Sequence, residues 1–235
     1  MRILYIYPHP DDESFGPARI ISKQKRQGHE VFLLTLTKGG ATKQRFKFNY
    51  TVEQMGEVRY KEMLNVAKVL NLNGMKVLDF PDSGLKELDP REIEAAIREE
   101  IQRIKPNVVV TYPVHGISGF HDHIVAHAAI KRVFCELKPS APYLKRLAFE
   151  TVTEEESKEF EAIKLNWSKP EEIDCVVQID DADIQKCYEA LDCYETYKGV
   201  IDGWDFKKYM QAPTTSFEIF QERHDPPLGD LCDGL

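Results

Sequence analysis

The stretch Ile3–Glu13, which reads ILYIYPHPDDE, decides how the rest of the chain is interpreted. Its first half is apolar on both faces, which is typical of a strand in a sheet that is covered on both sides. Two prolines then keep the backbone out of a helix until Pro10. Neighbouring carboxylates repel each other. The residues after Pro8 therefore indicate either a bound cation, for which His9 and the aspartates offer nitrogen and oxygen ligands, or an acidic cap on the next helix.

Strand and helix patterns alternate regularly after this stretch. Helices are expected over 15–27, 52–70, 89–104 and 122–134, and strands over 31–37, 77–80 and 108–112. This alternation predicts an α/β fold with a Rossmann-like, doubly wound and mainly parallel sheet. If the strand order is the common 3-2-1-4-5, the loops after the first and fourth strands meet at the switch point. Ligands bind there, outside the carboxyl ends of the strands.

The pattern is weaker in the last hundred residues. Strands are expected over 147–151, 175–179 and 217–220, an amphipathic helix over 182–197 and a solvated acidic segment over 154–161. No linker composition separates this part from the rest. We therefore expect residues 1–235 to form a single domain, with 1–135 as the core that carries the site and 136–235 as a C-terminal extension of it.

Composition excludes several classes of partner. The 235 residues carry a formal net charge of -8, so no nucleic acid and no anionic membrane surface is expected as a partner. No apolar run approaches the roughly 20 residues of a membrane span, and Met1 leads directly into a strand without a signal peptide. The five cysteines are scattered without a C-x-x-C pair. This usage is typical of reduced thiols and predicts a cytoplasmic protein.

The two loops at the switch point carry complementary chemistry. A catalytic zinc takes three protein ligands and keeps one position open for water. His9 and Asp12 after the first strand and His123 after the fourth supply two histidines and a carboxylate. Asp11 remains beside the metal, where a general base for the water would sit. A zinc ion also activates water and polarises a carbonyl, so the sequence predicts hydrolysis of an amide or ester.

The residues that carry this chemistry resemble a known family. PHPDDE at 8–13 after a first strand, together with the Asp-His pair at 122–123, is similar to the LmbE-like (PIG-L) zinc deacetylases. The resemblance covers residues 1 to about 135. It implies removal of the acetyl group from an N-acetylglucosamine-type sugar conjugate, with Zn²⁺ as the cofactor. It also implies that His9, Asp12 and His123 bind zinc and that Asp11 is the base.

Two further positions look like substrate contacts of that family. The resemblance implies that Arg59 reaches the sugar and that Asp82, after the third strand, accepts hydrogen bonds from sugar hydroxyls. Each has a plainer alternative. Arg59 would otherwise be an exposed helix residue paired with Glu57 or Glu62, and Asp82 would be a turn residue.

The sequence departs from the family at the second motif. The family usually has His-Pro-Asp-His there, whose first histidine stabilises the oxyanion and protonates the leaving amine. This chain has Phe120 at that position, so His121 becomes the candidate general acid, with His115 as another. Asp122 is expected to orient a histidine that binds the metal, and His127 to lie beside the site or in the packing.

Other functions stay open at this level. The same site could serve another metal-dependent esterase or phosphoesterase, and Phe120 allows a non-catalytic module that binds a sugar or a metal. The basic loop 43–47 could receive a phosphate or carboxylate and act as a mobile lid. The expected partner is a small amino-sugar substrate, and a homo-oligomer is an open option.

Overall fold

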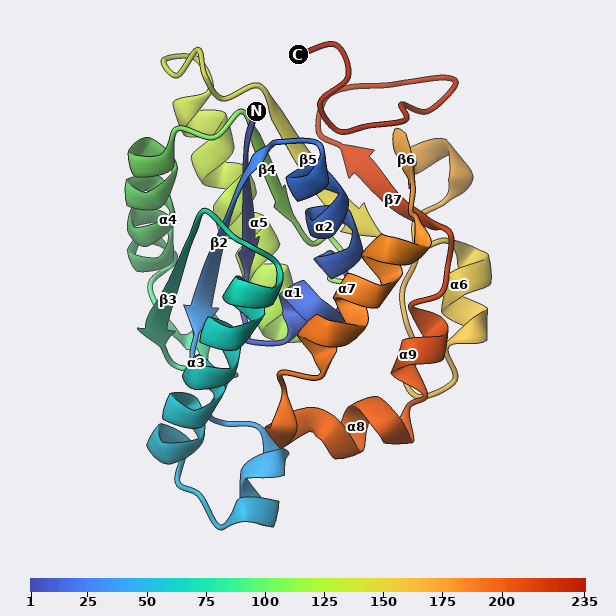
Figure 1. Ribbon diagram of the computed structural model, residues 1–235. Coiled ribbons are helices and arrows are strands. Elements are labelled where there is room, and N and C mark those ends of the chain that lie inside the picture. The colour runs from blue at the N-terminus through green and yellow to red at the C-terminus, as the bar shows by residue number, and fades with distance from the viewer.

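One seven-stranded sheet organises the chain (Figure 1). The computed structural model describes all residues 1–235. The strands are β1 (Arg2–Tyr7), β2 (Glu30–Thr37), β3 (Gly74–Phe80), β4 (Val108–Thr111), β5 (Arg146–Thr151), β6 (Cys175–Gln178) and β7 (Thr214–Ile219). Their order is β3-β2-β1-β4-β5-β7-β6. The first five are parallel and β7 is antiparallel to both neighbours. The predicted α/β class and the 3-2-1-4-5 order are confirmed.

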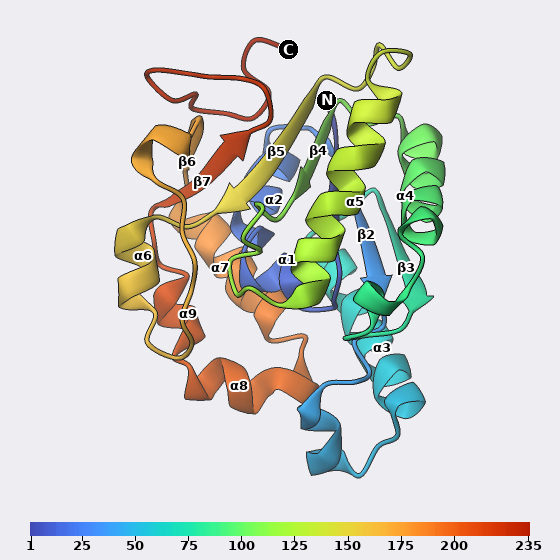
Figure 2. The same ribbon diagram turned by 180° about the vertical axis from the view of Figure 1, so that it is seen from behind.

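Helices cover both faces of the sheet. They are α1 (Asp12–Phe15), α2 (Ala18–Arg26), α3 (Val52–Val69), α4 (Pro90–Ile104), α5 (His121–Leu137), α6 (Glu154–Glu159), α7 (Asp181–Leu191), α8 (Lys198–Gly203) and α9 (Phe206–Tyr209). Figure 1 shows α2, α3 and α7 in front of the sheet, and Figure 2, seen from the other side, shows α4 and α5 on the opposite face. Successive side chains of β1 point to opposite faces of the sheet. Tyr5 and Tyr7 therefore pack in the front core, and Leu4 and Ile6 pack in the rear core.

Two expected helices were too long. The helix expected over 15–27 begins only at Ala18, because the chain leaves the helical conformation at Gly16, and Phe15 instead ends the separate short helix α1. Proline has no N–H to donate and disfavours a helical conformation at the residue before it. The helix expected over 182–197 ends at Leu191, and the short 3₁₀ turn Glu195–Tyr197 follows after a break.

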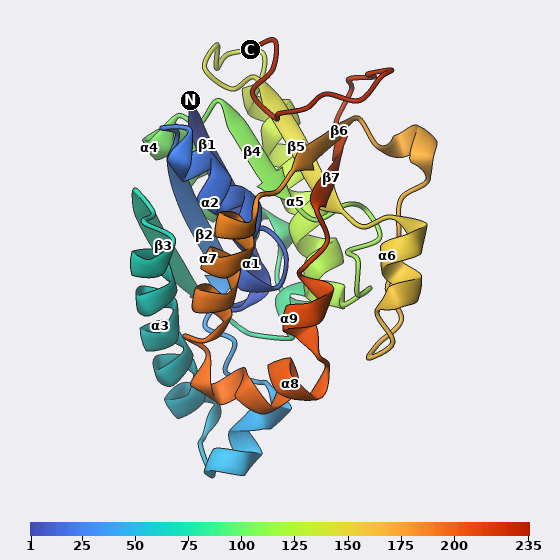
Figure 3. The ribbon, with the colours of Figure 1, turned by 45° about the vertical axis from the view of Figure 1, so that its right-hand side comes forward.

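Residues 136–235 extend the same sheet and also cover its carboxyl edge. β5, β7 and β6 add to the side of β4, and the segment from Tyr197 to Met210 carries α8 and α9. Figure 3 shows α8 and α9 at the end of the sheet where the parallel strands finish, beside α1. None of the helices has both the length and the apolar character that crossing a membrane requires.

Candidate active site

The loops after β1 and β4 meet at the carboxyl edge of the sheet. The two strands are direct neighbours, with Tyr5 paired to Val110. The ring centroids of His9 and His123 are 5.4 Å apart, although 114 positions separate the residues in the sequence. The parallel order of the sheet therefore brings together the residues that the sequence analysis singled out.

His9, Asp12 and His123 form a cluster that could hold a metal ion. One ligand atom from each lies within 4.8 Å of the others. Asp12 stands between the imidazoles: its Oδ2 is 3.5 Å from His9 Nδ1 and its Oδ1 is 3.4 Å from His123 Nε2. Both distances exceed those of ordinary hydrogen bonds to nitrogen. The three groups face one another without bonding directly.

The hydrogen bonds around both histidines leave lone pairs that face Asp12. His123 Nδ1 donates to the carbonyl of Gly116 at 2.9 Å. Its Nε2 is therefore an acceptor, and this atom is buried without a hydrogen-bond partner. His9 Nε2 donates to Asp122 Oδ2 at 3.1 Å, which leaves Nδ1 with the free lone pair. A buried acceptor without a partner is costly, so this donor set fits a divalent cation.

The charges around His9 also favour a cation. Burial alone would lower its pKa, but the carboxylates of Asp12, Asp122 and Asp82 outweigh burial and raise the pKa of His9 to about 10. Burial lowers the pKa of His123, which keeps that ring neutral. A positive charge at this place is therefore favoured, and a metal ion can supply it in place of the proton.

Asp11 lies beside the cluster but outside it. Its φ of 86° is an unusual conformation for a residue other than glycine. The backbone N–H of Asp11 donates to the hydroxyl of Tyr194 at 2.8 Å, and Arg59 Nη2 donates to Asp11 Oδ2 at 2.6 Å. Burial raises the pKa of Asp11 to about 8, although the charge of Arg59 opposes that shift. The strained backbone and two fixed partners hold this carboxyl group at the wall of the cavity.

Arg59 connects the loop after β1 to the loop after β2. The residue is 2% exposed. It donates to the carbonyls of Gly39 and Pro10, and its guanidinium lies 4.3 Å from the ring centre of Tyr197. The alternative of an exposed residue paired with a neighbouring glutamate is wrong. The predicted contact with a sugar stays a prediction.

Asp82 and Asp122 link the loop after β3 to the cluster. Asp82 Oδ2 accepts from the backbone of Ala41 at 2.7 Å, and Oδ1 lies 3.4 Å from His9 Nε2. Asp122 accepts from the backbone N–H groups of Ser83 and Leu85 as well as from His9. Asp122 therefore fixes the orientation of His9, while Asp82 lines the cavity.

The other histidines lie outside the cavity. His121 is exposed at the start of α5 and is not among the residues that line it. His115 contacts Ser168 with Nε2 at 3.3 Å, and His127 bonds the carbonyl of Tyr112. Phe120 lines the cavity with its ring nearly perpendicular to that of His123 and is 57% exposed.

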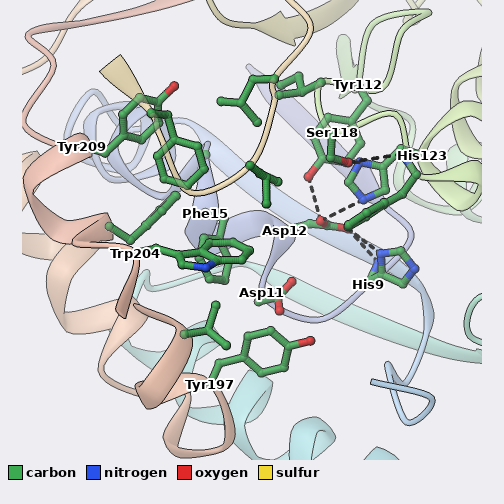
Figure 4. A pocket seen from close by; sticks show the side chains of 18 of the residues that line it. His9, Asp11, Asp12, Phe15, Tyr112, Ser118, His123, Tyr197, Trp204 and Tyr209 are labelled. Carbon is green, nitrogen blue, oxygen red and sulfur yellow. Dashed lines mark hydrogen bonds and ion pairs between the residues drawn. The ribbon is translucent and has the colours of Figure 1, made fainter. Parts of the chain in front are cut away.

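The cluster opens into a cavity of about 600 Å³ (Figure 4). Sequence reasoning missed two tyrosines that hold its polar end. The hydroxyl of Tyr112, directly after β4, donates to Asp12 Oδ1 at 2.7 Å, and its position at a strand end was a usable signal. Tyr194 comes from the C-terminal part, where no sequence pattern linked it to Asp11.

Known proteins are similar to this chain mainly over its first part. Residues 4–134 match the family described as PIG-L: GlcNAc-PI de-N-acetylase. The probable N-acetyl-alpha-D-glucosaminyl L-malate deacetylase 2 of Bacillus subtilis is 30% identical over 142 residues, which are 60% of this chain and 64% of that protein. The chain thus spans less than two thirds of the length of this relative.

Solved structures share the fold over nearly the whole chain. The zinc-inhibited form of teicoplanin deacetylase Orf2 has a TM-score of 0.74 at 15% identity and covers 96% of this chain and 99% of that one. The 4-carboxy-2-hydroxymuconate hydratase of Pseudomonas putida KT2440 scores 0.73 at 14% identity, over 95% and 97%. At such identities the likeness concerns the fold alone. The family match over residues 4–134 shows that the chain belongs to the PIG-L family.

Proposed function

We propose that this protein is a zinc-dependent hydrolase that removes the N-acetyl group from an N-acetylglucosamine-type sugar conjugate. One observation supports this proposal above the others. His123 Nε2 is a buried acceptor without a partner, opposite a carboxylate and a second imidazole, with Asp11 beside them. This is the arrangement of three ligands and a neighbouring base that metal-dependent amide hydrolysis uses.

Each residue of the cluster has a distinct task in this proposal. His9, Asp12 and His123 would hold the zinc ion. Bound zinc lowers the pKa of water and polarises a carbonyl oxygen. Asp11 takes the proton of the attacking water, and Arg59 keeps its carboxylate turned toward the cavity through the 2.6 Å contact. Asp122 keeps the Nδ1 lone pair of His9 facing Asp12.

The leaving amine needs a proton donor. The sequence predicts His121 as the general acid, but its side chain is exposed and lies outside the cavity. Asp11 already lines the cavity beside the cluster, so the proton that it takes from water can pass from the same carboxyl group to the leaving amine. We assign proton delivery to Asp11 and retain His121 as the competing candidate. His121→Ala separates them: activity close to wild type supports Asp11, and a 100-fold loss of kcat supports His121.

Polar groups around the cluster suit an amino sugar. Asp82, with Ala41–Gln44 and Ser83, lines the side of the cavity next to β2 and β3. Carboxylate and backbone groups of this kind are typical partners of sugar hydroxyls.

The five cysteines are all free thiols, which supports the cytoplasmic location predicted from the sequence.

Asp11→Asn tests the assignment of the base. The amide cannot accept a proton, so acetate release from N-acetylglucosamine conjugates should fall at least 100-fold, within the range usual for loss of a general base. Bound zinc, measured by metal analysis, should stay close to stoichiometric. Asp79→Asn, which alters an exposed carboxylate on β3, is the matched control and should keep full activity.

Three results would contradict the proposal in different ways. Undiminished acetate release by the Asp11→Asn variant would show that Asp11 is not the general base. Phosphate release from sugar phosphates without acetate release would favour a phosphoesterase. Stoichiometric zinc without turnover of any N-acetyl sugar would favour a binding module.

A further inference from the structure

The cavity changes character along the carboxyl edge of the sheet. The metal cluster lies at its centre, after β1 and β4. The walls on the β2 and β3 side are mainly polar, with Asp82, Ser83 and residues 41–44. The walls on the β5 and β7 side are apolar and come from α1, the segment after β5, α8 and α9: Phe15, Val152, Phe160, Ile163, Leu165, Val200, Trp204, Phe206 and Met210. We call this second half the apolar chamber.

Aromatic side chains make the apolar chamber continuous. Phe15 meets Phe206 at 4.3 Å between ring centroids, and Phe160 meets Tyr209 at 4.7 Å and Trp204 at 5.8 Å. Figure 4 shows Phe15, Trp204 and Tyr209 on the side of Asp12 that is away from His9. These rings surround open space that no protein atom fills. Cavities with apolar walls favour apolar ligand groups over water.

Three hydrogen-bonding groups of this half have no partner. Arg19 Nε, Thr215 Oγ1 and the Tyr209 hydroxyl are buried without a hydrogen bond, and all three residues line the cavity. Arg19 and Thr215 are at least nine-tenths buried. The three atoms are themselves closed off from the open space, so the aromatic and aliphatic side chains form most of the accessible wall on this side. Glu150 is the carboxylate on this side, but it accepts from Tyr7 and no ion pair joins it to Arg19.

The geometry of an amide decides which part of a substrate enters the chamber. A secondary amide is planar and trans, so its acyl substituent points away from the carbon attached to nitrogen. If the sugar lies against Asp82 and the amide at the metal cluster, the acyl substituent points toward the chamber. An acetyl group offers one methyl and leaves the chamber unfilled.

We propose that the chamber receives an N-acyl group that is larger than acetyl and apolar along its length. This inference rests on the hydrolase proposed above and names its substrate class. Hydrolysis breaks the C–N bond and adds the oxygen of water to the acyl carbon. The amino sugar leaves with the proton, and the chamber releases a carboxylic acid.

A series of N-acyl glucosamines tests the proposal. With zinc-loaded protein, kcat/KM should rise roughly fourfold for each methylene from acetyl to hexanoyl, the gain expected for burying one methylene. N-acetylglucosamine with an octyl aglycone should gain less than N-octanoyl-glucosamine.

Ile163→Trp locates the effect in the chamber. The larger ring occupies part of the space, so the ratio of kcat/KM for hexanoyl over acetyl should fall at least tenfold. Leu64→Trp, at an exposed position of α3, is the matched control and should keep the wild-type ratio. An unchanged ratio in the Ile163→Trp variant would overturn the proposal.

Binding gives a second measurement that needs no turnover. In the Asp11→Asn variant, N-octanoyl-glucosamine should change the emission of Trp204, and the change should vanish when Trp204→Phe is added. Cleavage of acetyl without preference for longer groups, or a preference for the octyl aglycone, would overturn this inference and leave the hydrolase intact. Failure to cleave any N-acyl amino sugar would overturn both.

Discussion

At the scale of single residues, Glu150 links the cavity to the stability of the fold. It is 4% exposed, and burial raises its pKa to about 7 from an ordinary value of 4.5, against the hydrogen bond from Tyr7 and the charge of Arg19. Between these pH values the folded protein keeps a proton that the unfolded chain releases. The free energy of unfolding therefore falls as pH rises from about 4.5 to about 7.

Glu150→Gln should remove that dependence. The amide still accepts from Tyr7 but does not ionise, so the variant should gain about 1–3 kcal/mol relative to wild type between pH 5 and pH 8. Urea unfolding at both pH values measures the difference. Parallel pH profiles for the two proteins would show that the carboxyl group is not the cause.

Some of the site residues could be predicted and others could not. His9, Asp12 and His123 follow from the chain order of strands, because parallel topology fixes which loops are neighbours. Glu150 lies in a short strand where a charged residue reads as solvent-facing. Tyr194 reaches Asp11 only through the packing of α7, which no local pattern encodes.

At the scale of elements, the turn after β2 positions the base. Gly39 has a φ of +64°, and its carbonyl accepts from Arg59. A Cβ there would lie 2.2 Å from Arg59 Nη1 and 2.8 Å from Pro10 Cδ. The close approach of three loops therefore depends on glycine at this position.

Gly39→Ala should displace Arg59 and release Asp11. We expect the free energy of unfolding to fall by more than about 2 kcal/mol, because the strain at positive φ adds to a clash in the interior. Acetate release should fall at least 100-fold. Gly28→Ala is the control. Its φ of +85° carries similar strain, but nothing lies within 4 Å of the new Cβ. The two variants should differ in activity. Equal activity would show that the turn at Gly39 does not position Asp11.

The element boundaries show what local patterns encode. The break at Gly16–Pro17 follows from the chemistry of proline, whereas apolar spacing alone continues across it. The end of α7 at Leu191 has no such signal. The short helices α8 and α9 depend on packing over the cavity, since helices of that length have little stability of their own.

At the scale of the whole molecule, the two parts of the chain build one cavity. Residues 1–135 supply the ligands and the polar wall, and residues 136–235 supply most of the apolar chamber. The alternating pattern of the first part predicted its topology. The antiparallel placement of β7 between β5 and β6 is a non-local pairing, which a single sequence does not specify.

A metal that joins loops from β1 and β4 should stabilise the entire fold. Binding to the folded state alone adds about 2.7 kcal/mol at a zinc concentration 100 times Kd. For a chain of this size that corresponds to a rise in Tm of about 5–10 °C, which EDTA should reverse. Asp12→Asn should abolish the rise, and His224→Gln, a change in the C-terminal tail, should keep it. A second cluster, His29, Asp230 and Cys232, lies near the N-terminus. If zinc bound there, Asp12→Asn would retain the shift and Cys232→Ser would lose it, because the stabilising ion would then not bridge the two loops.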